Sequence, residues 1–262
     1  MNRIAKKFIE LKLKEKKAFI AYLTVGYPKI AVTEKLILEL SRLGADMFEL
    51  GVPFSDPLAD GPVIQESSAF ALKHKVNLEK VFSLAARLRK KINNPILIMG
   101  YYNPILIYGL ERFAKKAKLS GLDGIIVPDL SLEEESELRK YLNKYGIYLI
   151  NFLAPTTDLS RIKHIARQSK GFIYYVSVTG VTGARKKLAS GIFQRIGYLK
   201  KFVRIPVCVG FGISTRKQFK EISQFSDGAI IGSAIIRKIK ENIGKKDLST
   251  RVVKFTKGII PA

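Results

Sequence analysis

The sequence predicts an α/β protein in which eight parallel strands, each followed by a helix, close into a barrel. Short apolar runs alternate regularly with longer amphipathic stretches, and the length of 262 residues suits one such barrel. No Gly/Ser-rich linker divides the chain. We therefore expect residues 1–262 to form a single (β/α)8, or TIM, barrel domain. An open, doubly wound parallel sheet is the alternative.

The first seventeen residues predict an additional amphipathic helix. Ile4, Phe8 and Leu11 lie among lysines at nearly helical spacing, and we expect this helix to close the bottom of the barrel. A basic amphipathic helix can also bind a membrane or target an organelle, but Glu10 and Glu15 argue against a targeting segment.

The remaining elements follow in order along the chain. The apolar runs predict strands at Ala18–Thr24, Asp46–Leu50, Ile96–Met99, Gly124–Val127, Tyr148–Leu153, Phe172–Ser177, Val207–Gly210 and Gly228–Ile231. The stretches between them predict helices at Ala31–Leu43, Val63–Lys91 with a break near Val76-Asn77, Pro104–Leu119, Leu132–Lys144, Leu159–Gln168, Ser190–Lys201, Arg216–Gln224 and from Ala234 onward.

Composition limits the functional classes. A net charge of +24 could favour binding of nucleic acid, an anionic membrane or an anionic substrate. The basic residues, however, are scattered over nearly every predicted helix. Because the basic residues do not gather in one stripe, we expect no nucleic-acid partner. No apolar run approaches the length of a membrane span, so we also expect no membrane association. Cys208 is the only cysteine, so a disulfide framework within the chain is excluded and a reducing cytoplasm is expected.

Two carboxylates near the end of the second predicted strand are the candidate catalytic residues. Glu49 lies among apolar residues, where burial raises the pKa of a carboxyl group and suits it to acid–base chemistry. Asp60 follows in a polar loop, where we expect it to remain ionised. Two carboxylates in unlike settings can divide the acid and base roles.

Three glycine-bearing turns follow the last three predicted strands. They are Thr179–Arg185, Gly210–Ser214 and Gly232–Ala234. Glycine exposes backbone amides to an anion, and a helix beginning at Gly232-Ser233 directs its positive end toward one. Three such turns in succession predict a phosphate site at the carboxyl ends of the strands.

The segment FELGVPFSDPLADGPVIQ, from Phe48 to Gln65, resembles the signature of the tryptophan synthase α subunit family. The resemblance extends over essentially the whole chain. It implies phosphate binding by Gly183, Gly212, Gly232 and Ser233, contacts to substrate by Tyr101, Tyr174, Phe211 and Thr182, and a mobile lid over residues 178–188. Tyr22 stands where phenylalanine is familiar in that family, which adds a hydroxyl near the pocket.

The resemblance also implies a reaction. The family cleaves indole-3-glycerol phosphate to indole and glyceraldehyde 3-phosphate, with Glu49 transferring protons and Asp60 stabilising the indole N–H. No cofactor is expected because the indole ring itself accepts the electrons, and no metal is expected because the two histidines, His74 and His164, lie on predicted helices. A β subunit is the implied partner, in an α2β2 heterotetramer. Another phosphate-binding TIM-barrel enzyme acting on a sugar phosphate is the alternative.

Overall fold

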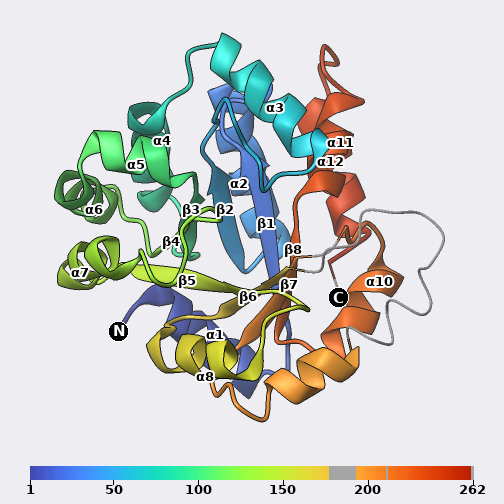
Figure 1. The fold of residues 1–262 in the computed structure, drawn as a ribbon. Helices are drawn as coiled ribbons and strands as arrows, with labels where there is room; N and C mark the ends of the chain where they lie inside the picture. Colours follow the sequence, from blue (N-terminus) through green and yellow to red (C-terminus); the bar gives the residue numbers. More distant parts are fainter. Residues whose placement is uncertain (177–192, 211, 261–262) are drawn as a thin grey trace.

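Eight parallel strands form a closed barrel at the centre of the molecule (Figure 1). The computed structural model describes residues 1–176, 193–210 and 212–260. Neighbouring strands pair in chain order, and the last strand pairs with the first, so the closed barrel is confirmed and the open sheet is wrong. The strands are β1 (Ala18–Thr24), β2 (Met47–Gly51), β3 (Ile96–Met99), β4 (Gly124–Ile126), β5 (Tyr148–Leu153), β6 (Ile173–Val176), β7 (Val207–Gly210) and β8 (Gly228–Ile231).

Helices surround the barrel (Figure 1). They are α1 (Arg3–Leu13), α2 (Ile30–Leu43), α3 (Pro62–Lys73), α4 (Leu78–Arg89), α5 (Tyr102–Tyr108), α6 (Leu110–Leu119), α7 (Ser136–Lys144), α8 (Leu159–Gln168), α10 (Arg216–Ser223), α11 (Ser233–Lys240) and α12 (Leu248–Lys257). Residues 193–199 are also helical. Within the part of the chain that the structure describes, no helix has the length and apolar character needed to cross a bilayer.

Two helix predictions needed correction. The stretch Pro104–Leu119 contains two helices rather than one, because Gly109 adopts φ 90°, a conformation that an α-helix cannot contain. Helix α7 begins at Ser136, four residues later than predicted, after a series of turns. The predicted break near Val76-Asn77 is confirmed, since Asn77 accepts a hydrogen bond from Lys80 N and begins α4.

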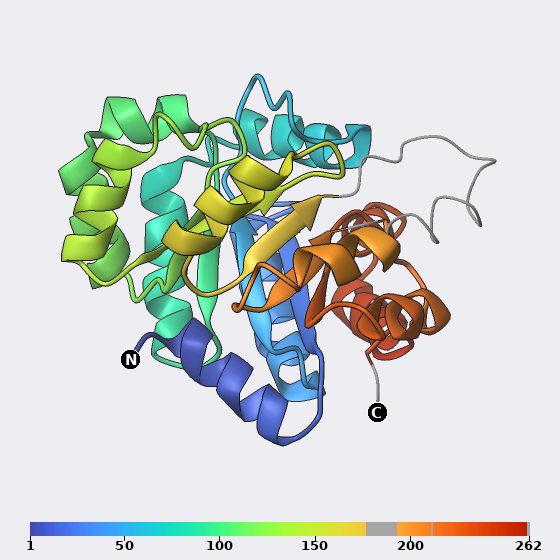
Figure 2. The ribbon, with the colours of Figure 1, turned by 60° about the horizontal axis from the view of Figure 1, so that its bottom comes forward.

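Helix α1 lies across the end of the barrel at which the strands begin, as predicted (Figure 2). Its Ile4 side chain is fully buried and lies so close to the start of β4 that a Cβ on Gly124 would be 2.9 Å from Ile4 Cδ1. The Asn2 side chain accepts a hydrogen bond from Ile4 N and donates one to Asp123 O at 2.8 Å. The first turn of α1 is therefore fixed to the barrel by both packing and hydrogen bonds.

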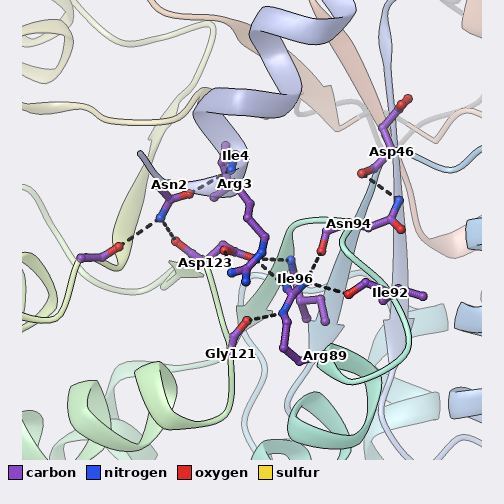
Figure 3. A network of polar contacts seen from close by, with 11 residues as sticks. Asn2, Arg3, Ile4, Asp46, Arg89, Ile92, Asn94, Ile96, Gly121 and Asp123 are labelled. Carbon is purple, nitrogen blue, oxygen red and sulfur yellow. Dashed lines mark hydrogen bonds and ion pairs between the residues drawn. The ribbon is translucent and has the colours of Figure 1, made fainter.

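A polar network stabilises the same end of the barrel (Figure 3). The buried Asp123 carboxylate forms ion pairs with Arg3 at 3.0 Å and Arg89 at 2.8 Å, and accepts a hydrogen bond from Ile96 N. Arg89 also donates to three backbone carbonyl groups, so its partly buried guanidinium is well satisfied. These contacts join α1, α4 and the starts of β3 and β4. The candidate catalytic residues lie at the opposite end of the barrel, where the strands end.

Candidate active site

Glu49 projects from β2 into the interior of the barrel. It pairs in register with Tyr22 on β1 and Leu97 on β3. The residue is fully buried, and neither carboxylate oxygen has a hydrogen-bond partner among the described residues. Burial, together with the charge of Asp60, raises the pKa of Glu49 to about 8. At neutral pH this side chain is therefore a protonated acid, as burial in an apolar segment predicted.

Asp60 lies beside Glu49 in the loop between β2 and α3. Its backbone is held by Gln65, whose side chain donates to Asp60 O at 2.9 Å from the first turn of α3. Burial raises the pKa of Asp60 to about 6, while a hydrogen bond from the Tyr101 hydroxyl opposes that rise. Asp60 is half-buried, and with this pKa it carries its charge at pH 7.

Tyr101 connects the loop that carries Asp60 to the segment after β3. Its hydroxyl accepts a hydrogen bond from Ala59 N at 3.0 Å, and its ring stacks on Phe54 with centroids 5.0 Å apart. The phenol therefore contacts the Asp60 loop through both its backbone and its carboxylate. Asp129 follows the neighbouring strand β4, and both of its carboxylate oxygens accept from Tyr102 N, so it stabilises the start of α5.

Tyr174 faces the interior from β6, on the far side of the barrel from Asp60. It packs on Phe152 with ring centroids 5.0 Å apart, and a Cβ on Gly210 would lie 2.5 Å from its ring. Burial, and then the charge of Glu49, raises the pKa of Tyr174 well above its usual value. Tyr101, in the segment after β3, therefore lies near Asp60, and Tyr174, on β6, lies near both carboxylates.

Two of the predicted phosphate turns lie at neighbouring strand ends. Residues Gly210 and Ile230 pair in register on β7 and β8, and Gly212 and Gly232 each follow two positions later. Gly212 adopts φ 23°, which favours glycine, and Ser233 is the first residue of α11. The backbone amides at the start of α11 are thus placed beside the turn after β7. Thr182, Gly183, Phe211 and the predicted lid at residues 178–188 lie outside the described residues.

Sequence reasoning did not foresee how Tyr22 and Gly51 fit together. A Cβ on Gly51 would lie only 2.1 Å from the Tyr22 hydroxyl oxygen, so only glycine leaves room for this phenol. The one indication in the sequence was that Gly51 follows Glu49 by two residues and therefore faces the same side of β2. The described residues contain no group of three His, Cys, Asp or Glu side chains arranged to hold a metal ion.

Comparison with known proteins agrees with this geometry. Residues 8–259 match the family model described as "Tryptophan synthase alpha chain". The chain belongs to the tryptophan synthase alpha chain family. A member from Geobacter sulfurreducens is 45% identical, over 99% of this chain and 98% of its own length. One from Thermoanaerobacter pseudethanolicus is 43% identical over 97% of each.

Solved structures support the same assignment. Tryptophan synthase subunit alpha from Legionella pneumophila superposes with a TM-score of 0.91 at 37% identity, covering 99% of this chain and 97% of that one. Tryptophan synthase from Mycobacterium tuberculosis contains a chain with a TM-score of 0.89 at 31% identity, covering 98% and 96%. The chain is thus a lyase of tryptophan biosynthesis that cleaves indole-3-glycerol phosphate to indole and glyceraldehyde 3-phosphate.

Proposed function

We propose that Glu49 and Asp60 carry out this cleavage in unlike protonation states. Glu49, protonated at neutral pH, donates its proton to indole C3, and the ring becomes a cation whose positive charge reaches the N–H group. The ionised Asp60 accepts a hydrogen bond from that N–H and stabilises the charge. The observation that carries this proposal is the fully buried Glu49 carboxyl group beside a second carboxylate of lower pKa.

The second half of the reaction returns Glu49 to its starting state. Its carboxylate removes the proton from the hydroxyl on the carbon attached to the ring. The O–H electrons form the aldehyde C=O bond, the bond between that carbon and C3 breaks, and its electrons restore the neutral indole. The products are indole and glyceraldehyde 3-phosphate, and Glu49 is protonated again.

The remaining predicted residues take binding roles in this proposal. The backbone of Gly212, Gly232 and Ser233, with Gly183, binds the phosphate group, because amides at a helix start and a glycine turn favour an anion. Tyr101, Tyr174, Phe211 and Thr182 contact the rest of the substrate. Residues 1–262 form one domain in this proposal, and the protein acts in the cytoplasm.

We further propose that a β subunit binds at the mouth of the barrel, in an α2β2 heterotetramer. Three apolar side chains on the segments after β2 and β3 are exposed there: Leu58 at 92%, Leu106 at 50% and Ile107 at 79%. These two segments are joined by the hydrogen bond from Ala59 N to the Tyr101 hydroxyl. A partner on this face would contact the loop that carries Asp60, which would couple its state to the active site.

The test is release of indole from indole-3-glycerol phosphate by the purified chain, with and without a β subunit. Glu49→Gln should lower turnover at least about a hundredfold, the usual weight of a positioned acid–base group. Glu66→Gln, the same change at an exposed glutamate of α3, is the matched control and should leave turnover near normal. Near-normal turnover in Glu49→Gln would refute the role of Glu49. Turnover that does not respond to the β subunit would refute the proposed partner.

A further inference from the structure

Tyr22 spans the interior of the barrel between the phosphate turn and the carboxylates. The residue is 6% exposed and pairs in register with Glu49. A Cβ on Gly232 would lie 3.2 Å from the Tyr22 Cβ and ring, whereas a Cβ on Gly51 would lie 2.1 Å from its hydroxyl oxygen. The base of this side chain therefore lies beside the start of α11, and its hydroxyl lies over the end of β2.

Among the described residues, the hydrogen of the Tyr22 hydroxyl has only a distant acceptor. Ser67 Oγ donates to the Ile64 carbonyl at 2.8 Å, and it lies 2.6 Å from Thr24 Oγ1. Because each hydroxyl has one hydrogen, Thr24 must be the donor to Ser67, and it has none left for Tyr22. Tyr22 is thus a donor toward Thr24, but at 3.4 Å that contact is well beyond the usual O–H···O distance.

The Tyr22 hydroxyl, buried near the end of β2, is therefore left with this long contact as its hydrogen bond to the described residues. The charges of Asp60 and Glu49 both reach this phenol, and each raises its pKa after burial, the largest cause. A buried donor with so distant an acceptor is poorly satisfied, and a bound molecule with an oxygen at the right place would give it a better partner.

We propose that Tyr22 is a specificity-determining residue whose hydroxyl donates a hydrogen bond to the middle hydroxyl of the glycerol chain of indole-3-glycerol phosphate. This inference rests on the proposed function. The glycerol chain must run from the phosphate turn at Gly232 to Glu49, which is the path that Tyr22 follows. The indole ring offers only an N–H donor, and the hydroxyl next to the ring faces Glu49, so the middle hydroxyl is the acceptor that remains.

The test compares two ligands that differ in their side-chain hydroxyls. Indole-3-glycerol phosphate has both, whereas 3-(indol-3-yl)propyl phosphate has neither. Dissociation constants are measured by calorimetry on the Glu49→Gln background, where substrate is not consumed, with Tyr22 present or changed to phenylalanine. Tyr22→Phe should weaken binding of indole-3-glycerol phosphate by about fivefold to tenfold, the value of one neutral hydrogen bond, and change binding of the propyl compound by less than about twofold.

Tyr175→Phe is the matched control, because Tyr175 is also buried and, being next to Tyr174 on β6, faces away from the interior. It should weaken neither ligand. Equal weakening of both ligands by Tyr22→Phe would show that the hydroxyl serves packing or Asp60 instead, and would overturn the proposal, as would no weakening of either. Indole release by the wild-type chain is scored separately. Its absence would refute the proposed function, whereas release without the selective loss would refute the role of Tyr22 alone.

Discussion

Replacing Glu49 by glutamine should make the protein more stable relative to wild type as the pH rises. The folded state holds this carboxyl group with a pKa of about 8, against 4.5 in an unfolded chain. A raised carboxyl pKa means that the folded state binds the proton more tightly, so its contribution to stability is complete below pH 4.5 and is lost as the pH rises through 8. Glutamine occupies nearly the same volume and does not titrate.

The size of the effect follows from that difference in pKa. Between pH 5 and pH 8 the wild-type protein should lose about 3 to 4 kcal/mol of stability through Glu49, at 1.36 kcal/mol per pH unit. Urea unfolding of both proteins, followed by circular dichroism at several pH values, measures the difference in the free energy of unfolding. The other titrating groups are common to both proteins, so their contributions largely cancel in the difference between the two free energies of unfolding. A difference that stays constant with pH would refute the conclusion that Glu49 is buried without a partner.

Three further changes test other parts of the site and its support. The plot of kcat/KM against pH should be bell-shaped, rising as Asp60 ionises near pH 6 and falling as Glu49 ionises near pH 8, as measured by indole release. Gly51→Ala should destabilise the protein by about 1 to 3 kcal/mol in urea unfolding, because its Cβ would displace the Tyr22 phenol. Asp123→Asn should cost about 3 kcal/mol in the same assay, because it removes the charge that two arginines share, while the affinity for the propyl compound stays unchanged.

Each of the two substitutions has a control within the chain. Gly61→Ala places a methyl group where no atom lies within 4 Å, so it should cost far less than Gly51→Ala. Asp247→Asn breaks an ion pair with Arg251 that is exposed on both sides, so it should cost far less than Asp123→Asn. A kcat/KM that only rises between pH 5 and pH 9 would contradict the acid role of Glu49. Equal costs within either pair of variants would show that the local contacts are misassigned.

The barrel and its carboxylates could be predicted because their signals are local in sequence. Apolar runs bounded by glycine and proline identified the strands, and Glu49 is marked by its apolar neighbours on β2. The helix boundary at Gly109 could not be predicted in this way, because apolar residues continue through it at helical spacing. Its φ of 90° is a backbone property that the hydrophobic pattern does not record.

Contacts between distant segments account for the other differences. Asp60 lies in a polar loop, and the composition of that loop predicted only that the carboxylate is ionised. The structure places Tyr101, 41 positions later in the sequence, against that loop, and burial raises the pKa. In the same way, the bond between Thr24 and Ser67 joins residues 43 positions apart, so the direction of the Tyr22 hydroxyl could be worked out only from the fold.

The two ends of the barrel handle buried charge in opposite ways. Asp123 at the bottom is surrounded by donors, two arginines and a backbone N–H, so its burial is compensated and α1 is fixed in place. Glu49 at the top has no partner among the described residues, so its burial is compensated only while it keeps its proton. That arrangement costs stability whenever Glu49 ionises, and the same cost makes its proton available near neutral pH. A donor placed beside Glu49 to stabilise the charge would lower its pKa and weaken it as the acid that begins the reaction.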